Sequence, residues 1–238
     1  MSPDELAGRA ALVTGASSGV GRATALALAR AGADVLAVAR REPLLQELAA
    51  EHEAVRTVSL DLTDADAVRE LAAGLDRLDL LVYAAGVNVP RRAVRELSLD
   101  DWRHVLDVNA TAAFLLVQAC LPPLRAAAGL VVVVASVSSR WPDASGAAYQ
   151  ASKRAVLGLA HAVAREERDV RVSAVLPGLV DTALLDARLQ PPSPDERAQA
   201  LQPEDVAAAC LFLAGLDPRA FVPELVILPT ALQRIGGT

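Results

Sequence analysis

The chain has 238 residues, which is long enough for one α/β domain to bury a core unaided. Hydrophobic residues make up 53%, yet uninterrupted apolar runs such as 130–135 are far shorter than a membrane span. A formal net charge of −6 argues against nucleic acid as a partner. The first residues lack the basic segment of a signal peptide. We therefore expect a cytoplasmic protein that binds neither membrane nor nucleic acid.

Apolar β-type runs alternate along the chain with amphipathic helical patterns. The predicted strands are 10–14, 34–39, 56–60, 79–84, 130–136, 171–176 and 225–228, and the predicted helices are 21–30, 42–51, 64–75, 112–121, 148–167 and 203–214. Such alternation predicts right-handed crossovers and a doubly wound parallel sheet with helices on both faces. The interpretation is a single domain over 1–238, whose ligand crevice lies at the carboxyl ends of the strands.

The stretch 181–200 breaks this alternation. It carries Pro191, Pro192 and Pro194 among polar residues and follows a predicted strand. A lid over a ligand site and a plain surface loop both fit this composition.

Three glycines directly follow the first predicted strand, where the first helix begins. Gly15 permits a tight turn, Gly19 lets backbone approach a pyrophosphate, and Gly21 lets the helix pack close to the strand. Ser17 and Ser18 add hydroxyl groups, and the helix amino terminus offers N–H donors to phosphates. The position of the loop favours a dinucleotide site over an ordinary glycine-rich turn.

The second predicted strand ends at Arg40 and Arg41, where an NAD-selective site normally has an acid. Two guanidinium groups suit a 2′-phosphate, which favours NADP(H), although both arginines also fit solvated loop positions. Asp61 ends the third strand, where it is suited to accept a hydrogen bond from adenine or to cap the next helix.

Tyr149 and Lys153 stand one helical turn apart, and Lys153 is the only lysine among 23 basic residues. A phenol with a pKa of about 10 is a poor proton carrier at neutral pH, and a nearby ammonium lowers that pKa. The pair therefore suggests a general acid/base. A half-buried tyrosine beside an exposed lysine on an ordinary helix is the alternative.

Ser136 closes a predicted strand at the edge where the site is expected, so its hydroxyl can donate to a substrate carbonyl beside Tyr149. Ser138 and Ser139 are nearby rivals in the following loop. Asn109 interrupts an otherwise helical stretch, where its amide suits either a water relay to Lys153 or a satisfied place in the core.

Cys120 and Cys210 both fall in apolar helical patterns, with no pair of closely spaced cysteines and no clustered histidines. Two buried thiols and no metal site are expected.

Taken in order, the glycine loop, Asn109, Ser136, the Tyr149–Lys153 pair and the segment from Pro177 to Thr182 resemble the classical short-chain dehydrogenase/reductase family. The resemblance runs from about residue 9 to residue 227. It implies a seven-stranded Rossmann fold, hydride transfer between nicotinamide and a carbonyl or alcohol substrate, and a homo-oligomer, either a dimer or a tetramer.

The same resemblance assigns roles to individual residues. Tyr149 becomes the general acid/base, Lys153 the ribose binder and pKa modifier, Ser136 the carbonyl orienter and Asn109 the water-relay residue. The cofactor would be held by Gly15, Ser17, Ser18, Gly19, Val20, Gly21, Arg40, Arg41, Asp61, Leu62, Ala84, Ala85, Gly86, Tyr149, Lys153, Pro177, Gly178, Val180 and Thr182.

The sequence departs from the family pattern after the fourth strand, where Asn-Asn-Ala-Gly is usual and Tyr83-Ala84-Ala85-Gly86 stands here. The asparagine side chains that brace the sheet are absent, so local rigidity is in question. The segments 139–142, 203–206 and 224–230 look more like the NADP-dependent branch that oxidises small 3-hydroxy acids and serine.

Two alternatives remain beside an NADP(H)-dependent carbonyl reductase or alcohol dehydrogenase. A reductase of carrier-linked 3-oxoacyl thioesters would need a basic docking patch, for which Arg91, Arg92 and Arg95 are candidates. A non-catalytic NADP(H)-sensing protein would keep the fold without turnover. The substrate pocket is expected to involve 88–92, 138–141 and the 181–200 segment.

Overall fold

A computed structural model describes residues 5–232 and shows a seven-stranded parallel sheet in the order β3-β2-β1-β4-β5-β6-β7. The strands are β1 (Ala10–Thr14), β2 (Asp34–Ala39), β3 (Val55–Ser59), β4 (Leu80–Tyr83), β5 (Leu130–Val134), β6 (Arg171–Pro177) and β7 (Glu224–Ile227). The order reverses between β1 and β4, and a doubly wound sheet opens its ligand crevice at such a point. The predicted fold class is confirmed.

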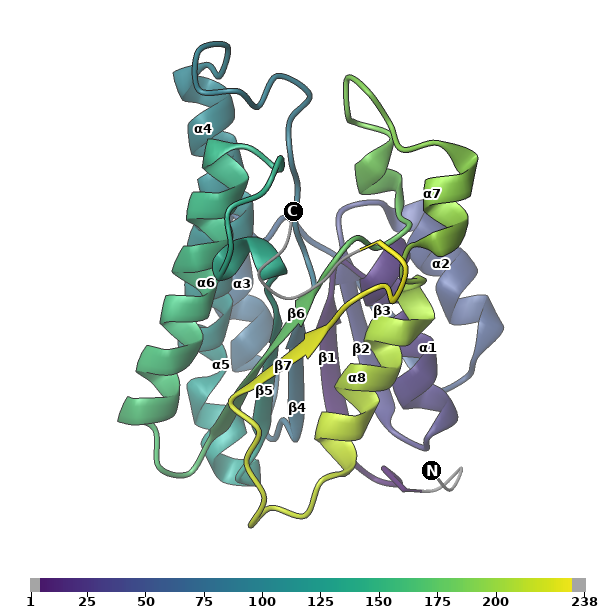
Figure 1. Ribbon diagram of the computed structural model, residues 1–238. Helices are drawn as coiled ribbons and strands as arrows, with labels where there is room; N and C mark the ends of the chain where they lie inside the picture. Colours follow the sequence, from purple (N-terminus) through teal and green to yellow (C-terminus); the bar gives the residue numbers. More distant parts are fainter. Residues whose placement is uncertain (1–4, 233–238) are drawn as a thin grey trace.

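Helices cover both faces of the sheet (Figure 1). They are α1 (Gly19–Arg30), α2 (Glu42–Glu51), α3 (Ala65–Ala73), α4 (Leu99–Leu106), α5 (Ala112–Ala127), α6 (Ala147–Glu166), α7 (Pro194–Gln199) and α8 (Pro203–Gly215), with a π-helical turn, η1 (Asp107–Thr111), and two 3₁₀ turns, η2 (Val137–Ser139) and η3 (Ala183–Leu185). Helices α1, α2 and α8 pack on one face and α3, α5 and α6 on the other. Helix α4 continues through η1 into α5, and α7 lies near the carboxyl ends of the strands (Figure 1).

Burial on both faces explains why the central strands are apolar without interruption. In β5, Val132 and Val134 join the core under α1 and α8, whereas Val131 and Val133 join the core under α5 and α6. Successive side chains of a strand point to opposite faces, so a strand covered on both sides has no polar face. The core therefore fixes the sheet rigidly beneath the strand ends.

Three helices differ from the sequence prediction: α4 has no counterpart among the predicted helices, α5 is longer than expected, and α7 was not expected. Helix α5 was expected to end near residue 121, yet it runs through Pro122 and Pro123. Pro123 and Leu124 are buried, the Leu78 N–H donates to the Pro123 carbonyl at 3.0 Å, and Ala128 ends the helix with a φ of 49°. Packing of the buried Pro123 and Leu124 thus offsets the hydrogen bonds that the prolines remove, and the Leu78 N–H ties the end of the helix to the residues before β4.

Helix α7 forms inside the proline-rich stretch that broke the strand–helix rhythm. Ser193 and Glu196 make a reciprocal capping box, and Pro194 occupies the first turn. A serine followed three residues later by a glutamate, with proline between them, is a helix-start signal that the sequence does contain.

The continuous helical stretch Leu99–Ala127 has 29 residues and a mean hydropathy of 1.5 in its most apolar window. By length and composition alone it is able to cross a membrane, as is the core helix of many folded domains. Its apolar residues Leu116, Val117 and Leu124 pack in the core beneath the sheet. One such helix is therefore weak support for a membrane segment.

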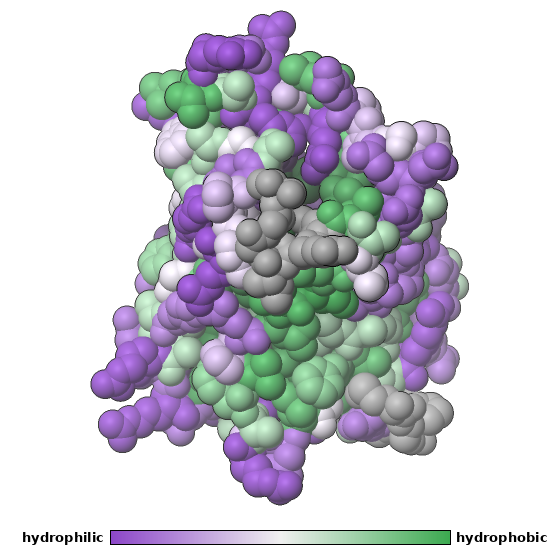
Figure 2. Space-filling model, in the orientation of Figure 1, coloured by the Kyte–Doolittle hydropathy of each residue, from purple (hydrophilic) through white to green (hydrophobic). Residues whose placement is uncertain are grey.

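A broad apolar area lies over β7 and α8 on the face seen in Figure 2. The exposed large side chains of this area include Phe212, Phe221 and Val226. β7 is an edge strand of the sheet.

Candidate active site

A cavity of about 710 Å³ opens at the carboxyl ends of the strands. Every residue predicted to hold the cofactor lines it, and so do Ser136, Tyr149 and Lys153. Asn109 does not line it and is fully buried. The residues predicted from the sequence thus meet in one cleft, except Asn109, which lies buried behind the cleft wall.

The nucleotide end of the cleft is built from backbone that tolerates no side chain. A Cβ on Gly21 would stand 2.5 Å from the Gly15 carbonyl oxygen, and one on Gly15 would stand 2.9 Å from the Ala85 Cα. Gly15 and Gly19 also have φ values of 66° and 54°, which favour glycine. The loop therefore forms a cradle whose shape depends on missing Cβ atoms.

The amino terminus of α1 faces this cradle without a side-chain cap or an acidic residue in its first turn. Its N–H groups and the positive end of its dipole are available to an anion. Thr182 closes the other side, because a Cβ on Gly19 would lie 3.2 Å from its methyl carbon. These features fit the pyrophosphate of a dinucleotide.

Arg40 and Arg41 differ in their surroundings. The Arg41 guanidinium donates to the Ser17 hydroxyl at 2.9 and 3.1 Å and to the Ser18 hydroxyl at 2.6 Å. Arg40 lies 3.8 Å from the Asp61 carboxylate and is more than half exposed. Both line the cleft, and Arg41 stands directly against the glycine loop.

Asp61 has local partners of its own. Its carboxylate accepts hydrogen bonds from the Thr63 N–H at 3.0 Å and the Thr63 hydroxyl at 2.8 Å. The Thr63 N–H, then the Thr63 hydroxyl and Arg40, lower the pKa of Asp61. The aspartate closes the turn after β3 while its side chain still borders the cleft.

Thr14 and Tyr83 hold residues 83–86, at the end of β4, in place by hydrogen bonds. The Thr14 hydroxyl accepts from the N–H groups of Ala84 at 3.1 Å and Ala85 at 3.2 Å. The buried Tyr83 hydroxyl donates to the Val108 carbonyl at 2.5 Å. These hydrogen bonds tie the end of β4 and the residues after it to β1 and η1.

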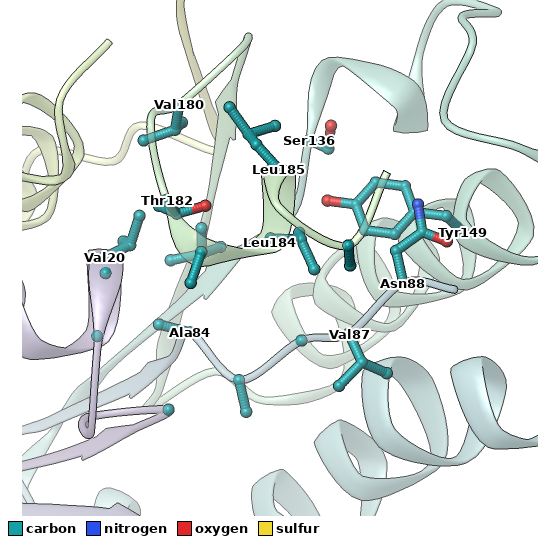
Figure 3. A pocket seen from close by; sticks show the side chains of 18 of the residues that line it. Val20, Ala84, Val87, Asn88, Ser136, Tyr149, Val180, Thr182, Leu184 and Leu185 are labelled. Carbon is teal, nitrogen blue, oxygen red and sulfur yellow. The ribbon is translucent and has the colours of Figure 1, made fainter. Parts of the chain in front are cut away.

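Tyr149 and Ser136 lie together at the other end of the cleft, which we call the reacting end because the sequence predicts the reaction there. The Tyr149 hydroxyl points into the cavity near Ser136 and Leu184 (Figure 3). Burial raises the pKa of Tyr149 to about 12, and a hydrogen bond with Ser136 opposes that rise. The sequence suggested that a nearby ammonium lowers the pKa of Tyr149. In the structure this pKa is raised instead, because burial outweighs any neighbouring positive charge.

Lys153 lies beneath Tyr149 and is buried. Its ammonium donates to the Val134 carbonyl at 2.8 Å and stands 5.7 Å from the Tyr149 ring centre. Burial lowers the pKa of Lys153 to about 8. The side chain is therefore fixed at the end of β5, against the aromatic ring.

Asn109 is held by three hydrogen bonds from within the protein. Its amide donates to the Val87 carbonyl at 3.0 Å and the Ser152 hydroxyl at 2.9 Å, and its oxygen accepts from the Val87 N–H at 2.7 Å. The π-helical turn η1 directs this side chain inward. Its amide thus ties the wall of the cleft to α6, and the water-relay role stays a prediction.

The serines that follow β5 have distinct places. Ser138 lines the cleft, contacts Ser136 at 3.1 Å and donates to Asp143, whereas Ser139 is buried and donates to the Lys153 carbonyl at 2.9 Å. The expected pocket segment 138–141 is correct only for Ser138. The cleft continues instead along 143–145, because Arg140 turns away to pair with Glu224.

The 181–200 segment folds over the reacting end rather than away from it. Its side chains that line the cleft are Thr182, Ala183, Leu184, Leu185, Ala187, Arg188 and Glu196. Arg197 anchors it through Asp181, at 3.0 Å, and Asp186. Movement of this segment as a lid stays a prediction.

Comparison with known proteins identifies the family of the chain. The family model described as short chain dehydrogenase matches residues 9–192. The rat dehydrogenase/reductase SDR family member 6 is 32% identical over 91% of this chain and 94% of its own length. The chain therefore belongs to the short-chain dehydrogenase family of oxidoreductases.

Two solved structures with bound cofactor are similar over nearly the whole chain. An alcohol dehydrogenase from Thermococcus sibiricus, complexed with 5-hydroxy-NADP, has a TM-score of 0.85 and 30% identity over 95% of this chain and 98% of its own. The closed form of a serine dehydrogenase with NADP⁺ has a TM-score of 0.87 and 28% identity over 96% and 98%. These likenesses support binding of a nicotinamide cofactor; the narrower hydroxy-acid branch stays a prediction.

Proposed function

We propose that the protein is an NADP(H)-dependent oxidoreductase that interconverts a carbonyl group and a secondary alcohol. The observation that carries the proposal is the meeting, in one cleft, of the Tyr149 hydroxyl, Ser136 and Lys153 with a glycine cradle. A non-catalytic sensing protein would have no need of a proton carrier at the open end of its cofactor site.

The chain's own residues supply the proton chemistry. When bound, the nicotinamide supplies or accepts the hydride at the reacting carbon. Ser136 donates to the carbonyl oxygen, and Tyr149 gives its phenolic proton to that oxygen as the carbonyl becomes an alcohol. In the opposite direction the alcohol oxygen returns one proton to Tyr149 while the C=O bond forms.

The raised pKa of Tyr149, about 12, keeps the phenol protonated at neutral pH. A protonated phenol is ready to act as the acid in carbonyl reduction, whereas oxidation needs a phenolate. The rate of oxidation should therefore rise with pH, because the fraction of Tyr149 present as phenolate grows.

The choice of NADP(H) is supported by Arg41. Its guanidinium already donates to Ser17 and Ser18 at the edge of the cradle, and Arg40 stands beside it in the cleft. A 2′-phosphate would meet two forked cations there instead of the acid that an NAD-selective site places at this position. Two similar structures carry NADP or an NADP derivative.

The test is NADPH consumption against a panel of carbonyl compounds, with Tyr149→Phe beside the wild type. The substitution removes only the proton carrier, so turnover should fall by roughly a hundredfold or more while NADPH binding persists. Equal turnover by the two proteins would exclude Tyr149 as the acid. If both bind NADPH and neither consumes it, the sensing function replaces the proposal.

We also infer that the chain forms a homo-oligomer. Within residues 5–232 one edge of β7 pairs with no other strand, and it lies beside an apolar area with exposed Phe212, Phe221 and Val226 (Figure 2). A second copy would cover both features. Light scattering on the purified protein tests this, and a monomer at all concentrations would contradict it.

A further inference from the structure

Three serines follow β5 in close succession, and the proposed reaction uses only the first of them, Ser136. Ser138 lines the cleft and donates its hydroxyl proton to Asp143. Ser139 does not line the cleft and is only 7% exposed, so it is not placed to touch a substrate. A buried hydroxyl needs a partner, and the partner of Ser139 lies on another element of the site.

The side chain of Ser139 ties the turn η2 to the middle of α6. Its hydroxyl donates to the Lys153 carbonyl at 2.9 Å. Lys153 lies one helical turn after Tyr149, inside α6, so its carbonyl moves only if the helix backbone moves. Ser139 is thus bonded to the rigid part of the helix that carries Tyr149.

The backbone of Ser139 faces Ser136 at the other end of the same turn. The Ser139 N–H donates to the Ser136 carbonyl at 2.9 Å, and the Ser136 hydroxyl oxygen accepts from the Ser138 N–H at 3.1 Å. These two bonds close η2 on itself, with Ser136 before its first residue and Ser139 as its last. A displacement of Ser139 therefore displaces Ser136 as well.

Lys153 holds the same segment from the other side of Ser136. Its ammonium donates to the Val134 carbonyl at 2.8 Å, at the end of β5. Val134 and Ser139 flank Ser136 in the chain, and both are bonded to Lys153, one to its ammonium and the other to its carbonyl. The segment that carries Ser136 is therefore fixed at two points to the residue one turn from Tyr149.

This double tie matters because the two hydroxyl groups proposed to act on one substrate oxygen come from different elements. Ser136 follows β5, whereas Tyr149 lies on α6, and the segment 140–146 between η2 and α6 contains no helix or strand. Groups that act together on a substrate must be held within about 0.5 Å of the productive geometry. The chain between Ser136 and Tyr149 does not provide this precision, so a bond between their elements must.

We propose that Ser139 is a positioning residue, which holds the Ser136 hydroxyl at its working distance from Tyr149 by bonding to the Lys153 carbonyl. The proposal rests on the oxidoreductase function proposed above and adds a residue that lies outside the cleft. Ser138 does not share this task, because its hydroxyl is bonded to the loop residue Asp143 instead of to α6.

The first experiment measures reduction of the carbonyl panel by the wild type and Ser139→Ala at saturating NADPH. Loss of the tie should lower kcat roughly tenfold, since a misplacement of about 1 Å can cost a hundredfold, and NADPH affinity should stay within about twofold. Ser139→Cys, whose thiol is a weaker donor of similar size, should restore part of the loss. In the Ser136→Ala background, Ser139→Ala should cause no further loss, because no hydroxyl is left to position.

Ser98→Ala is the matched control for lost stability. The Ser98 hydroxyl caps α4, where it accepts from the Asp101 N–H at 3.0 Å, and Ser98 does not line the cleft. Loss of such a cap destabilises a protein about as much as loss of one buried hydrogen bond. Its kcat should equal that of the wild type, so a tenfold loss in Ser139→Ala at a similar Tm is not a result of destabilisation.

The second experiment follows amide hydrogen exchange by mass spectrometry, without substrate. Ser139→Ala should speed exchange in a peptide that covers 135–146 and leave a peptide over 99–106 unchanged. Ser98→Ala should do the reverse. This measurement tests the tie between η2 and α6 independently of turnover.

The outcomes separate the two proposals. If the wild type reduces carbonyl compounds and Ser139→Ala keeps its kcat, or loses the same factor in the Ser136→Ala background, the positioning role is overturned while the oxidoreductase function stands. If the wild type reduces no carbonyl compound but exchange over 135–146 rises in Ser139→Ala, the proposed reaction falls and the tie between η2 and α6 stands. A loss of kcat in Ser98→Ala as large as that in Ser139→Ala would also overturn the positioning role.

Discussion

The two ends of the cleft are built in opposite ways. The nucleotide end consists of backbone: a glycine loop without space for Cβ atoms, a helix amino terminus, and side chains whose charges are already paired or hydrogen-bonded. The reacting end consists of side chains drawn from β5, α6, the 87–92 loop and the 181–200 segment, and two of its charges have no described partner. The nucleotide end is shaped by its backbone for one ligand, the cofactor. At the reacting end, substitution of side chains can change the charge and the shape of the cleft.

The sharpest way to break the nucleotide end is Gly21→Ala. The new Cβ would lie 2.5 Å from a backbone oxygen, so the loop or α1 must move. We expect the free energy of unfolding to fall by about 1–3 kcal/mol. NADPH affinity should fall roughly tenfold or more, which corresponds to about 1.4 kcal/mol of binding.

Gly158→Ala is the matched control, because it lies in α6 and a Cβ there meets nothing within 4 Å. Alanine in a helix interior should stabilise the protein by up to about 1 kcal/mol. Urea unfolding and NADPH titration measure both variants. If Gly21→Ala and Gly158→Ala had similar stability and similar NADPH affinity, the close approach of Gly21 to the Gly15 carbonyl would not shape the cradle.

Replacing Arg41 with serine tests whether cofactor preference belongs to the nucleotide end alone. Loss of a charged donor to the 2′-phosphate should weaken NADPH binding by roughly ten- to hundredfold and leave NADH binding nearly unchanged. Arg40→Ser should have a smaller effect on NADPH binding, because the Arg40 guanidinium already pairs with the Asp61 carboxylate. Titration of NADPH and NADH into both variants gives the ratio of the two affinities. An unchanged ratio in Arg41→Ser would contradict the binding of the 2′-phosphate by Arg41.

Lys153 stands where the two ends meet, and its burial should be visible in the pH dependence of stability. Burial lowers its pKa from 10.5 to about 8, so between these values the unfolded chain holds a proton that the folded chain has released. Stability should therefore rise with pH across this window, by up to about 1.4 kcal/mol per pH unit.

The measurement is urea unfolding of the wild type and Lys153→Met between pH 8 and pH 10, without added cofactor. The difference between the two proteins isolates the lysine from other titrating groups. The same slope in both proteins would mean that the Lys153 ammonium is not desolvated.

The smallest expected effect concerns the brace between the two ends. Tyr83→Phe removes the hydroxyl that donates to the Val108 carbonyl beside the Asn109 turn. Loss of this hydrogen bond should lower the free energy of unfolding by about 0.5–1.5 kcal/mol, with little change in NADPH affinity. Denaturant unfolding tests this, and a loss of affinity larger than the loss of stability would place Tyr83 in the cofactor site itself.

Local patterns were sufficient for most of the fold. Strand and helix positions agree with the sequence because continuous apolar runs and amphipathic periods are written directly in neighbouring residues. The continuation of α5 past Pro122 was missed, since it depends on the burial of Pro123 and Leu124 against other elements of the fold. Helix α7 was missed although Ser193 and Glu196 carried its capping signal.

The candidate site divides in the same way. The glycine loop, Ser136 and the Tyr149–Lys153 pair were predictable, because each is a short motif at a strand end or on one helix face. Arg188 and Asp143 carried no local signal that singled them out among other polar loop residues. Their place in the cleft results from how distant loops fold over the strand ends.

The sequence by itself determined the parallel sheet, the cradle for a nicotinamide cofactor and the residues that we propose carry the proton. These follow from spacing and side-chain chemistry within short segments. Only the tertiary structure decided that burial raises the pKa of Tyr149 and that Asn109 stands behind the wall of the cleft. It also placed Arg92 and Arg188 at the reacting end without a described acceptor. Burial and the meeting of distant charges arise from packing, which no short stretch of sequence contains.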